Sequence, residues 1–264
     1  MNWLEALILG IIQGIAEFLP ISSSGHLVIG RELLGLGATD NIAFETVVHC
    51  GTVLSTITIL RKDIMQLFIK LFKFEWNEET QYIAKIFLSM IPVMVVGFFF
   101  KDQVEALFGE GILLVGIMLL VTATLLALTH FVKFNQRKNV GWGSSFIIGV
   151  AQAVAVLPGL SRSGSTIATG LLLGVKKEEI AKFSFLMVLI PILGETFLGA
   201  MGGDFSAAAS GIPNISLIIG FLASYIVGCF ACKWMIELVK RTNLIWFAVY
   251  CTIAGIVAII TAIL

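Results

Sequence analysis

Long apolar runs separated by short polar segments dominate the chain. Six runs reach or approach the roughly 20 residues that a membrane-spanning helix needs. They cover about 43–60, 82–100, 112–132, 181–201, 215–235 and 244–264. Two further apolar regions, about 2–35 and 144–174, are interrupted near the middle by proline, glycine and serine. Each half is too short to cross a bilayer, so each region is predicted to form a re-entrant helix hairpin.

The order of these elements predicts an internal repeat. One hairpin followed by three spans occurs twice, over about 1–135 and about 140–264 of a single membrane domain, 1–264. Because three is an odd number, the second copy is expected to be inverted, so that the two hairpins meet near the midplane from opposite sides. The sequences SSSGH at 22–26 and SRSGS at 161–165 occupy equivalent places in the two copies. The predicted fold is an all-α integral membrane protein with an inverted-topology repeat.

Composition and charge support a membrane protein and orient it. The chain is 58% hydrophobic and 13% charged, and its mean hydropathy is +1.00, which exclude an ordinary soluble domain. Nearly all lysines and arginines fall in alternate loops, and the positive-inside rule then places both termini on the outer face. Segment 63–74 alternates apolar and basic residues with helical spacing, which predicts a surface helix. Membrane lipids are expected partners, nucleic acid is not, and a homodimer is left open.

The first hairpin carries a carboxylate and an amide on one helix face. Gln13 and Glu17 are four residues apart and precede a turn that contains Pro20. Their oxygens would suit Mg²⁺ or Ca²⁺, with water or phosphate completing the coordination. The alternative is a pair at a helix end that nearby backbone groups satisfy. Because a carboxylate within a membrane is costly, we favour the functional interpretation.

The residues after Pro20 predict an anion site. Ser22, Ser23, Ser24 and Gly25 would start a new helix, whose hydroxyls and free N–H groups could hold a phosphate. His26 follows and could act as base or nucleophile beside Ser23, because imidazole exchanges protons near neutral pH. The alternative is a serine cap with a structurally bonded histidine.

The second hairpin repeats this arrangement around an arginine. Arg162 lies between Ser161 and Ser163, and Thr166 follows one turn later. A guanidinium group presents a planar fork of donors that matches two phosphate oxygens. The alternative is a structural ion pair between Arg162 and Glu17, which would also join the two hairpins. The roles of three other polar residues in predicted spans, Glu45, His49 and Glu195, are left open: each could be a second partner of the site, a wall of the cavity or simply a packed polar group.

Together these motifs resemble a known family. Gln13-x-x-x-Glu17 followed by FLPISSSGH, with PGLSRSGST in the second half, resembles the bacterial undecaprenyl-diphosphatase family, the bacitracin-resistance type of lipid phosphatase. The resemblance implies that Glu17 is the metal-linked glutamate, that Ser23 and His26 are the active-site serine and histidine, and that Arg162 binds phosphate. The family's first motif position is Glu or Gln, and this chain has Gln13, which lowers the number of carboxylates available to a metal.

The resemblance also implies a reaction and a location. Undecaprenyl diphosphate would be hydrolysed to undecaprenyl phosphate and inorganic phosphate with Mg²⁺ or Ca²⁺, which recycles the lipid carrier of cell-wall synthesis at the bacterial inner membrane. The active site is expected to open on the outer face. The nucleophile is left open among His26, Ser23 and a metal-bound water. A secondary transporter or a lipid-phosphate flippase is the alternative, because carriers also use inverted repeats with broken helices.

Overall fold

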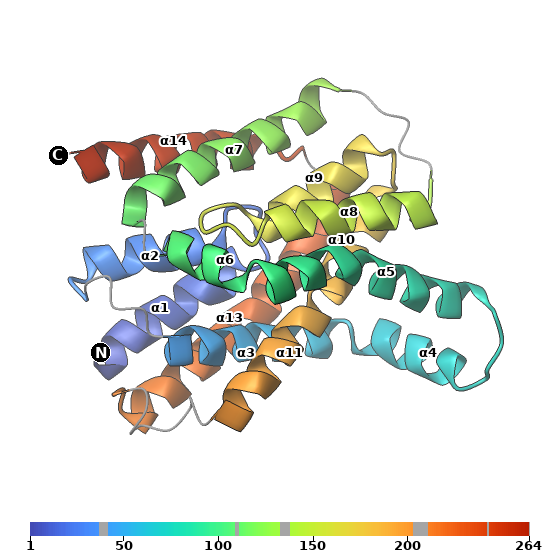
Figure 1. Cartoon of the computed structure of the whole chain (residues 1–264), viewed down its shortest axis with the longest axis horizontal. Coiled ribbons are helices and arrows are strands. Elements are labelled where there is room, and N and C mark those ends of the chain that lie inside the picture. Colours follow the sequence, from blue (N-terminus) through green and yellow to red (C-terminus); the bar gives the residue numbers. More distant parts are fainter. Residues whose placement is uncertain (37–41, 109–110, 133–137, 203–210, 242, 264) are drawn as a thin grey trace.

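The computed structural model describes residues 1–36, 42–108, 111–132, 138–202, 211–241 and 243–263 (Figure 1). These residues are helical, apart from turns and one isolated bridge between Lys138 and Val175. The helices are α1 (Trp3–Ala16), α2 (Ser23–Leu33), α3 (Ile42–Ile59), α4 (Arg61–Leu71), α5 (Glu78–Phe99), α6 (Lys101–Phe108), α7 (Gly111–Phe131), α8 (Trp142–Val154), α9 (Arg162–Leu172), α10 (Lys177–Met187), α11 (Leu189–Gly202), α13 (Asn214–Arg241) and α14 (Ile245–Ile263).

Among the described helices, four are long and apolar enough to cross a membrane: α5, α7, α13 and α14. They coincide with four of the predicted spans. Helix α3, which covers the predicted span 43–60, meets the same criterion only together with α4, from which it is bent by 75°. Helix α4 covers most of the segment 63–74, and none of its residues is buried, so it is the predicted surface helix. The chain is a multi-pass membrane protein.

The prediction of one continuous span over 181–201 is wrong. This region is divided between α10, which ends at Met187, and α11, which begins at Leu189. Pro191 lies in the first turn of α11. Proline has no N–H to donate, and its ring clashes with the carbonyl four residues earlier, which here belongs to Met187. Here the helix ends at Met187, and a new one begins at Leu189, just before the proline, although α5 continues through Pro92.

Both predicted hairpins are present as helix, turn and helix. Helices α1 and α2 form the first, and α8 and α9 form the second. In Figure 1 the open ends of the two hairpins point toward opposite ends of the molecule, and their turns lie between them. The N-terminus of α1 and the C-terminal end of α14 lie at one end of the long axis, and α4 lies at the other (Figure 1).

The tips of the hairpins touch. A Cβ atom added at Gly25 would lie 3.1 Å from the Cα atom of Gly159, and one added at Gly164 would lie 3.3 Å from the Cβ of Pro20. Glycine permits this close approach because it has no side chain. Longer helices support the hairpins from outside: α1 packs on α13, and α8 packs on α5. Helix α7 contacts α2 and α9, one helix of each hairpin, and packs on α14.

An apolar core anchors the turn of the first hairpin. Phe18 is fully buried and meets Phe185 of α10 edge to face, with ring centroids 5.4 Å apart. Aromatic pairs in this geometry contribute about 0.5–1.5 kcal/mol beyond the area that they bury. The turn that follows Glu17 is therefore fixed against the helix that the proline break terminates.

Candidate active site

The first hairpin buries a carboxylate at the end of α1. Gln13 lies in the last turn and is completely buried, and the side chain of Glu17 is only 6% exposed. The Nε2 atom of Gln13 donates a hydrogen bond to Oε2 of Glu17 over 2.9 Å. The sequence predicted this shared face, and the structure confirms it.

Helix α2 begins directly beside this carboxylate. The Oγ of Ser22 caps the helix by accepting from the N–H of Gly25 over 3.2 Å, and the hydroxyl of Ser23 donates to Oε2 of Glu17 over 2.7 Å. Ser22 has a φ of +72°, a conformation that costs a residue other than glycine about 1–2 kcal/mol. This backbone conformation turns the chain sharply, so that the side chain of Ser23 points back toward Glu17.

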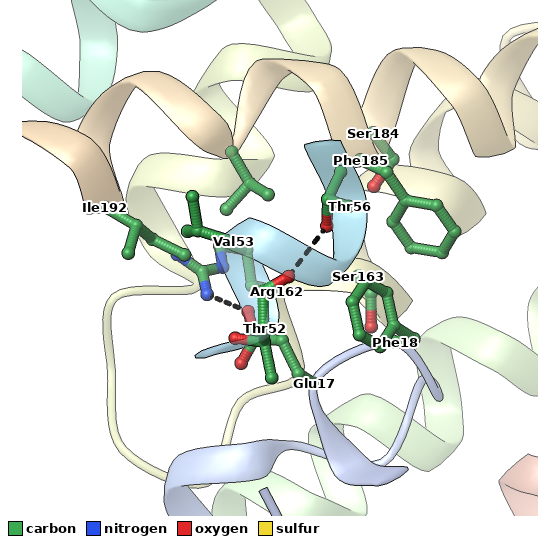
Figure 2. A pocket seen from close by; sticks show the side chains of 11 residues that line it. Glu17, Phe18, Thr52, Val53, Thr56, Arg162, Ser163, Ser184, Phe185 and Ile192 are labelled. Atoms are coloured by element: carbon green, nitrogen blue, oxygen red, sulfur yellow. Dashed lines mark hydrogen bonds and ion pairs between the residues drawn. The ribbon is translucent and has the colours of Figure 1, made fainter. Parts of the chain in front are cut away.

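Arg162 reaches the same carboxylate from the second hairpin. It is the first residue of α9, whose N-cap Ser161 accepts from the N–H of Gly164 over 3.0 Å. Its guanidinium forms an ion pair with Oε1 of Glu17, and Figure 2 shows the guanidinium directed at that carboxylate beside α3. The sequence left open whether Arg162 would bind phosphate or pair with Glu17. In the structure it pairs with Glu17.

His49 of α3 completes the group around Glu17. Its Nε2 atom lies 3.6 Å from Oε2 of Glu17, and its Nδ1 atom lies 2.8 Å from the backbone oxygen of Glu45. Glu45 is in turn paired with Arg31 at 2.9 Å. A buried charge is tolerated only when it is paired and hydrogen-bonded, and Glu17 has such partners on both oxygens. The sequence left the role of His49 open. In the structure His49 lies close to Glu17 and also lines a cavity beside the site.

Three of the residues around Glu17, namely Ser23, His49 and Arg162, line a large cavity of about 430 Å³. This volume lies within the range of ligand sites in proteins. Its polar lining comprises Ser22, Ser23, Ser24, Glu45, His49, Gln152 and Arg162. On another side of the Glu17–Arg162 pair lies a space of only about 10 Å³, lined in part by Thr52 and Thr56 (Figure 2). That space admits about one water molecule. The larger cavity is therefore the one that could admit a substrate.

The chain is similar to known proteins over nearly its whole length. Residues 6–257 match the family model described as bacitracin resistance protein BacA. The chain is 57% identical over 263 residues to a protein of Bacteroides fragilis, and 56% identical over 265 residues to one of Bacteroides thetaiotaomicron. Each alignment covers 99% of both chains, and both relatives are named undecaprenyl-diphosphatase. The chain belongs to the BacA family.

A relative from Parabacteroides distasonis bears the same name and is 56% identical, with 98% of each chain covered. The similarity spans the two hairpins and all the helices between them. The candidate site is thus built from both halves of a chain that aligns with its relatives almost from end to end.

Residues of the second hairpin that were predicted to bind phosphate make structural contacts, and one of them, Ser163, joins the two hairpins. The Oγ of Ser163 donates to the backbone oxygen of Leu19 over 3.0 Å, which links the second tip to the first. Thr166 bonds to the backbone oxygen of Arg162 at 2.9 Å and to the hydroxyl of Ser184 at 2.6 Å. The lining of the large cavity includes neither Ser161, Ser163 and Thr166 nor Gly25, which packs against the other tip.

His26 is directed at a partner that the sequence did not indicate. Its Nδ1 atom lies 2.8 Å from the backbone oxygen of Ser22, and its Nε2 atom lies 2.7 Å from the hydroxyl of Tyr250 on α14. The two rings also stack, with centroids 5.6 Å apart. Since Nδ1 must donate to a carbonyl oxygen, Nε2 accepts from Tyr250. No local pattern could have shown this contact, because 224 residues separate the partners.

The donors around Glu17 fit a hard divalent cation. The Oε1 atom of Gln13 is buried and has no hydrogen-bond partner in the structure, and Glu17 is adjacent to it. A carboxylate and an amide oxygen are ligands that Mg²⁺ and Ca²⁺ prefer. Within the described residues, no group of three or more His, Cys, Asp and Glu side chains could hold a metal ion. Any cation here would therefore need phosphate oxygens or water as additional ligands.

The role of Glu195, which the sequence left open, stays open, because its side chain lies outside the described residues.

Proposed function

We propose that this chain hydrolyses undecaprenyl diphosphate to undecaprenyl phosphate and inorganic phosphate. The observation that carries the proposal is the meeting of Glu17, Ser23 and Arg162 from two broken helices, with Ser23 and Arg162 lining a 430 Å³ cavity. Relatives that align over nearly the whole chain are named undecaprenyl-diphosphatase, which supports the same activity. The alternative of a transporter or a flippase has no support in these names.

Binding of a diphosphate would exchange one partner of Arg162 for another. Phosphoanhydride hydrolysis depends mainly on neutralising and positioning charge. Arg162 lines the cavity, and its planar donors fit two phosphate oxygens. The first N–H groups of α2, together with the hydroxyls of Ser22 and Ser24, add a second anion site. The Glu17–Arg162 pair thus keeps both charges satisfied until the substrate arrives.

Glu17 and Gln13 are the residues that would hold Mg²⁺ or Ca²⁺. A bound cation would supply charge neutralisation of the phosphate oxygens. When Arg162 turns to the phosphate, Glu17 retains hydrogen bonds from Gln13 and Ser23. The carboxylate therefore stays oriented beside Ser23, which lines the cavity, during the exchange.

The positions of Ser23 and His26 indicate which group would attack the phosphate. Ser23 lines the cavity and donates its hydroxyl proton toward Glu17, whereas His26 engages Ser22 and Tyr250. This geometry favours attack by Ser23, or by a water beside it, over direct attack by His26. His26 would then act from its place at the start of α2 by fixing the backbone of Ser22.

The same proposal includes an inverted repeat. Two features support it: the hairpins point in opposite directions in Figure 1, and α1 packs on α13 as α8 packs on α5. In each pairing, the first helix of one hairpin contacts a long helix of the other half. Such packing of each hairpin against the other half is expected when two inverted copies interlock around a central site.

The orientation in the bacterial inner membrane follows from charge. The two termini lie at the end of the molecule opposite α4, and α4 carries Arg61, Lys62 and Lys70 (Figure 1). Basic segments remain on the cytoplasmic side. We therefore assign the termini and the opening of the active site to the outer face.

Phosphate release by the purified protein in detergent tests the function. We expect the protein with Mg²⁺ to release one inorganic phosphate from each undecaprenyl diphosphate and to leave undecaprenyl phosphate. A protein that is folded by thermal unfolding but releases no phosphate with either Mg²⁺ or Ca²⁺ would overturn the proposal.

A further inference from the structure

The 430 Å³ cavity has an apolar half that the chemistry of phosphate does not require. Besides the serines and Arg162, its lining includes Val93, Met94, Val96 and Gly97 of α5 and Val104 of α6. None of these side chains can bind an anion. A site for free phosphate or a soluble diphosphate would not need such a wall.

This wall continues onto the lipid-facing surface. Met94 lines the cavity and is still 52% exposed, and Phe98, in the next turn of α5, is 77% exposed. Helix α5 is long and apolar enough to cross a membrane, so its exposed apolar side faces hydrocarbon. The cavity is therefore bounded on one side by a helix whose outer surface contacts the bilayer.

The physics of a lipid substrate makes a sideways approach the favourable one. A prenyl chain in the bilayer is already in an apolar medium, so a protein groove offers it no hydrophobic gain. Drawing the chain into water, in contrast, would cost about 0.8 kcal/mol for each CH₂ group exposed. The protein has only to let the headgroup reach its polar residues while the chain remains among apolar groups.

Resting on the proposed function, we propose that the first isoprene units of the substrate lie along α5 at Val93, Met94 and Gly97, and that the chain leaves the cavity there into the bilayer. Gly97 marks the passage, because a Cβ atom added to it would meet no atom within 4 Å. The open space next to Gly97 is where the chain passes. Val104 of α6 forms the neighbouring part of the wall.

Gly97→Leu tests this path, because an added Cβ atom meets no atom within 4 Å and the larger side chain extends from there into the open space. Leucine also favours a helix over glycine by roughly 0.5–1 kcal/mol, so the variant should fold. We expect the KM for undecaprenyl diphosphate to rise about tenfold or more, the effect of an overpacked contact of about 1.4 kcal/mol, with kcat nearly unchanged.

Two variants serve as matched controls. Val95→Leu enlarges a neighbouring side chain of α5 that is 44% exposed and does not line the cavity. Gly143→Leu makes the same substitution at a glycine of α8 that also has no atom near an added Cβ. Both should keep the wild-type KM. A Gly97→Leu protein with unchanged KM would overturn the proposed path.

Photolabelling locates the chain without depending on turnover. The probe is a C15 isoprenoid methylenebisphosphonate, which cannot be hydrolysed, with a benzophenone at the far end of the chain. We expect its labels in the peptide that contains residues 93–104, and we expect excess undecaprenyl diphosphate to remove them. Labels confined to α7 or α14 would overturn the path even if the enzyme is active, whereas failure of the proposed function would show as absent phosphate release by the wild type.

Discussion

Glu17 combines two properties that rarely occur together in a membrane protein, burial and negative charge. Arg162, Ser23 and Gln13 stabilise it, and His49 lies close by. Removing one member of a buried ion pair costs about 3–5 kcal/mol, because the remaining charge is left without a partner. Each of these contacts is therefore expected to affect stability as well as catalysis, and experiments must separate the two effects.

Replacing Glu17 by Gln keeps the shape of the side chain and removes its charge. We expect kcat to fall by about a hundredfold or more, because charge stabilisation in a desolvated site is lost. Phosphate release at saturating Mg²⁺ gives the rate, and thermal unfolding in detergent shows whether the fold is retained. Glu237→Gln, at a half-exposed residue that pairs with Arg241, is the control. Near-wild-type turnover by the Glu17 variant would remove this residue from the mechanism.

Replacing Gln13 by Glu introduces a second carboxylate next to Glu17. Without a cation the two charges repel, and with one they form a stronger site, since ligand charge raises affinity for divalent metals. We expect this variant to remain active with Mg²⁺ and to melt at a lower temperature than the wild type in EDTA. Added Mg²⁺ should recover most of that loss. A melting temperature that does not respond to Mg²⁺ would argue against a metal near position 13.

At the scale of elements, the site depends on the contact between two hairpin tips. Gly159 has a φ of +90° in the second tip, and a Cβ atom there would lie 2.7 Å from the backbone oxygen of Val115 on α7. The second tip is therefore held between α7 and the first hairpin, with no room for a side chain. Since Arg162 follows three residues later, its reach to Glu17 depends on this packing.

We expect Gly159→Ala to destabilise the protein and to reduce activity. The positive φ alone costs an alanine about 1–2 kcal/mol, and the contact with the backbone of Val115 adds to this. Thermal unfolding in detergent and phosphate release are the measurements. Gly143→Ala, at a helical position where the added Cβ meets nothing within 4 Å, should leave both unchanged. Equal stability of the two variants would contradict the tight contact between the tips.

At the scale of the whole molecule, orientation decides which pool of lipid diphosphate reaches the site. Ser24 lines the cavity and is partly exposed, so it can report access. In a background without the native cysteines, we expect Ser24→Cys to react with a membrane-impermeant thiol reagent added to intact cells. A methylenebisphosphonate analogue of the substrate should protect it.

Lys138→Cys supplies the matching control for sidedness. Lys138 follows α7 on the side that the charge distribution makes cytoplasmic, so the variant should react only after the membrane is opened. Reaction of position 138 in intact cells, or of position 24 only in inverted vesicles, would reverse the orientation. The site would then receive carrier lipid made inside the cell.

The sequence by itself determined the class of protein and most of its helices, and it predicted the residues of the candidate site. Apolar length, helix-breaking residues and the spacing of Gln13 and Glu17 are local properties, and the bilayer imposes strict rules on them. The helix break next to Pro191 is also a local feature of the sequence. The sequence analysis did not predict it, because the apolar run continues through the proline.

Only the tertiary structure decided which side chains meet. The partner of Arg162 lies 145 residues away, and that of His26 lies 224 residues away. His49 became a neighbour of Glu17 because α3 packs against α1. Such contacts depend on how helices cross and on where glycine lets backbones approach. Hydrophobic periodicity shows which face of a helix is buried, but it does not show which residue of another helix lies opposite.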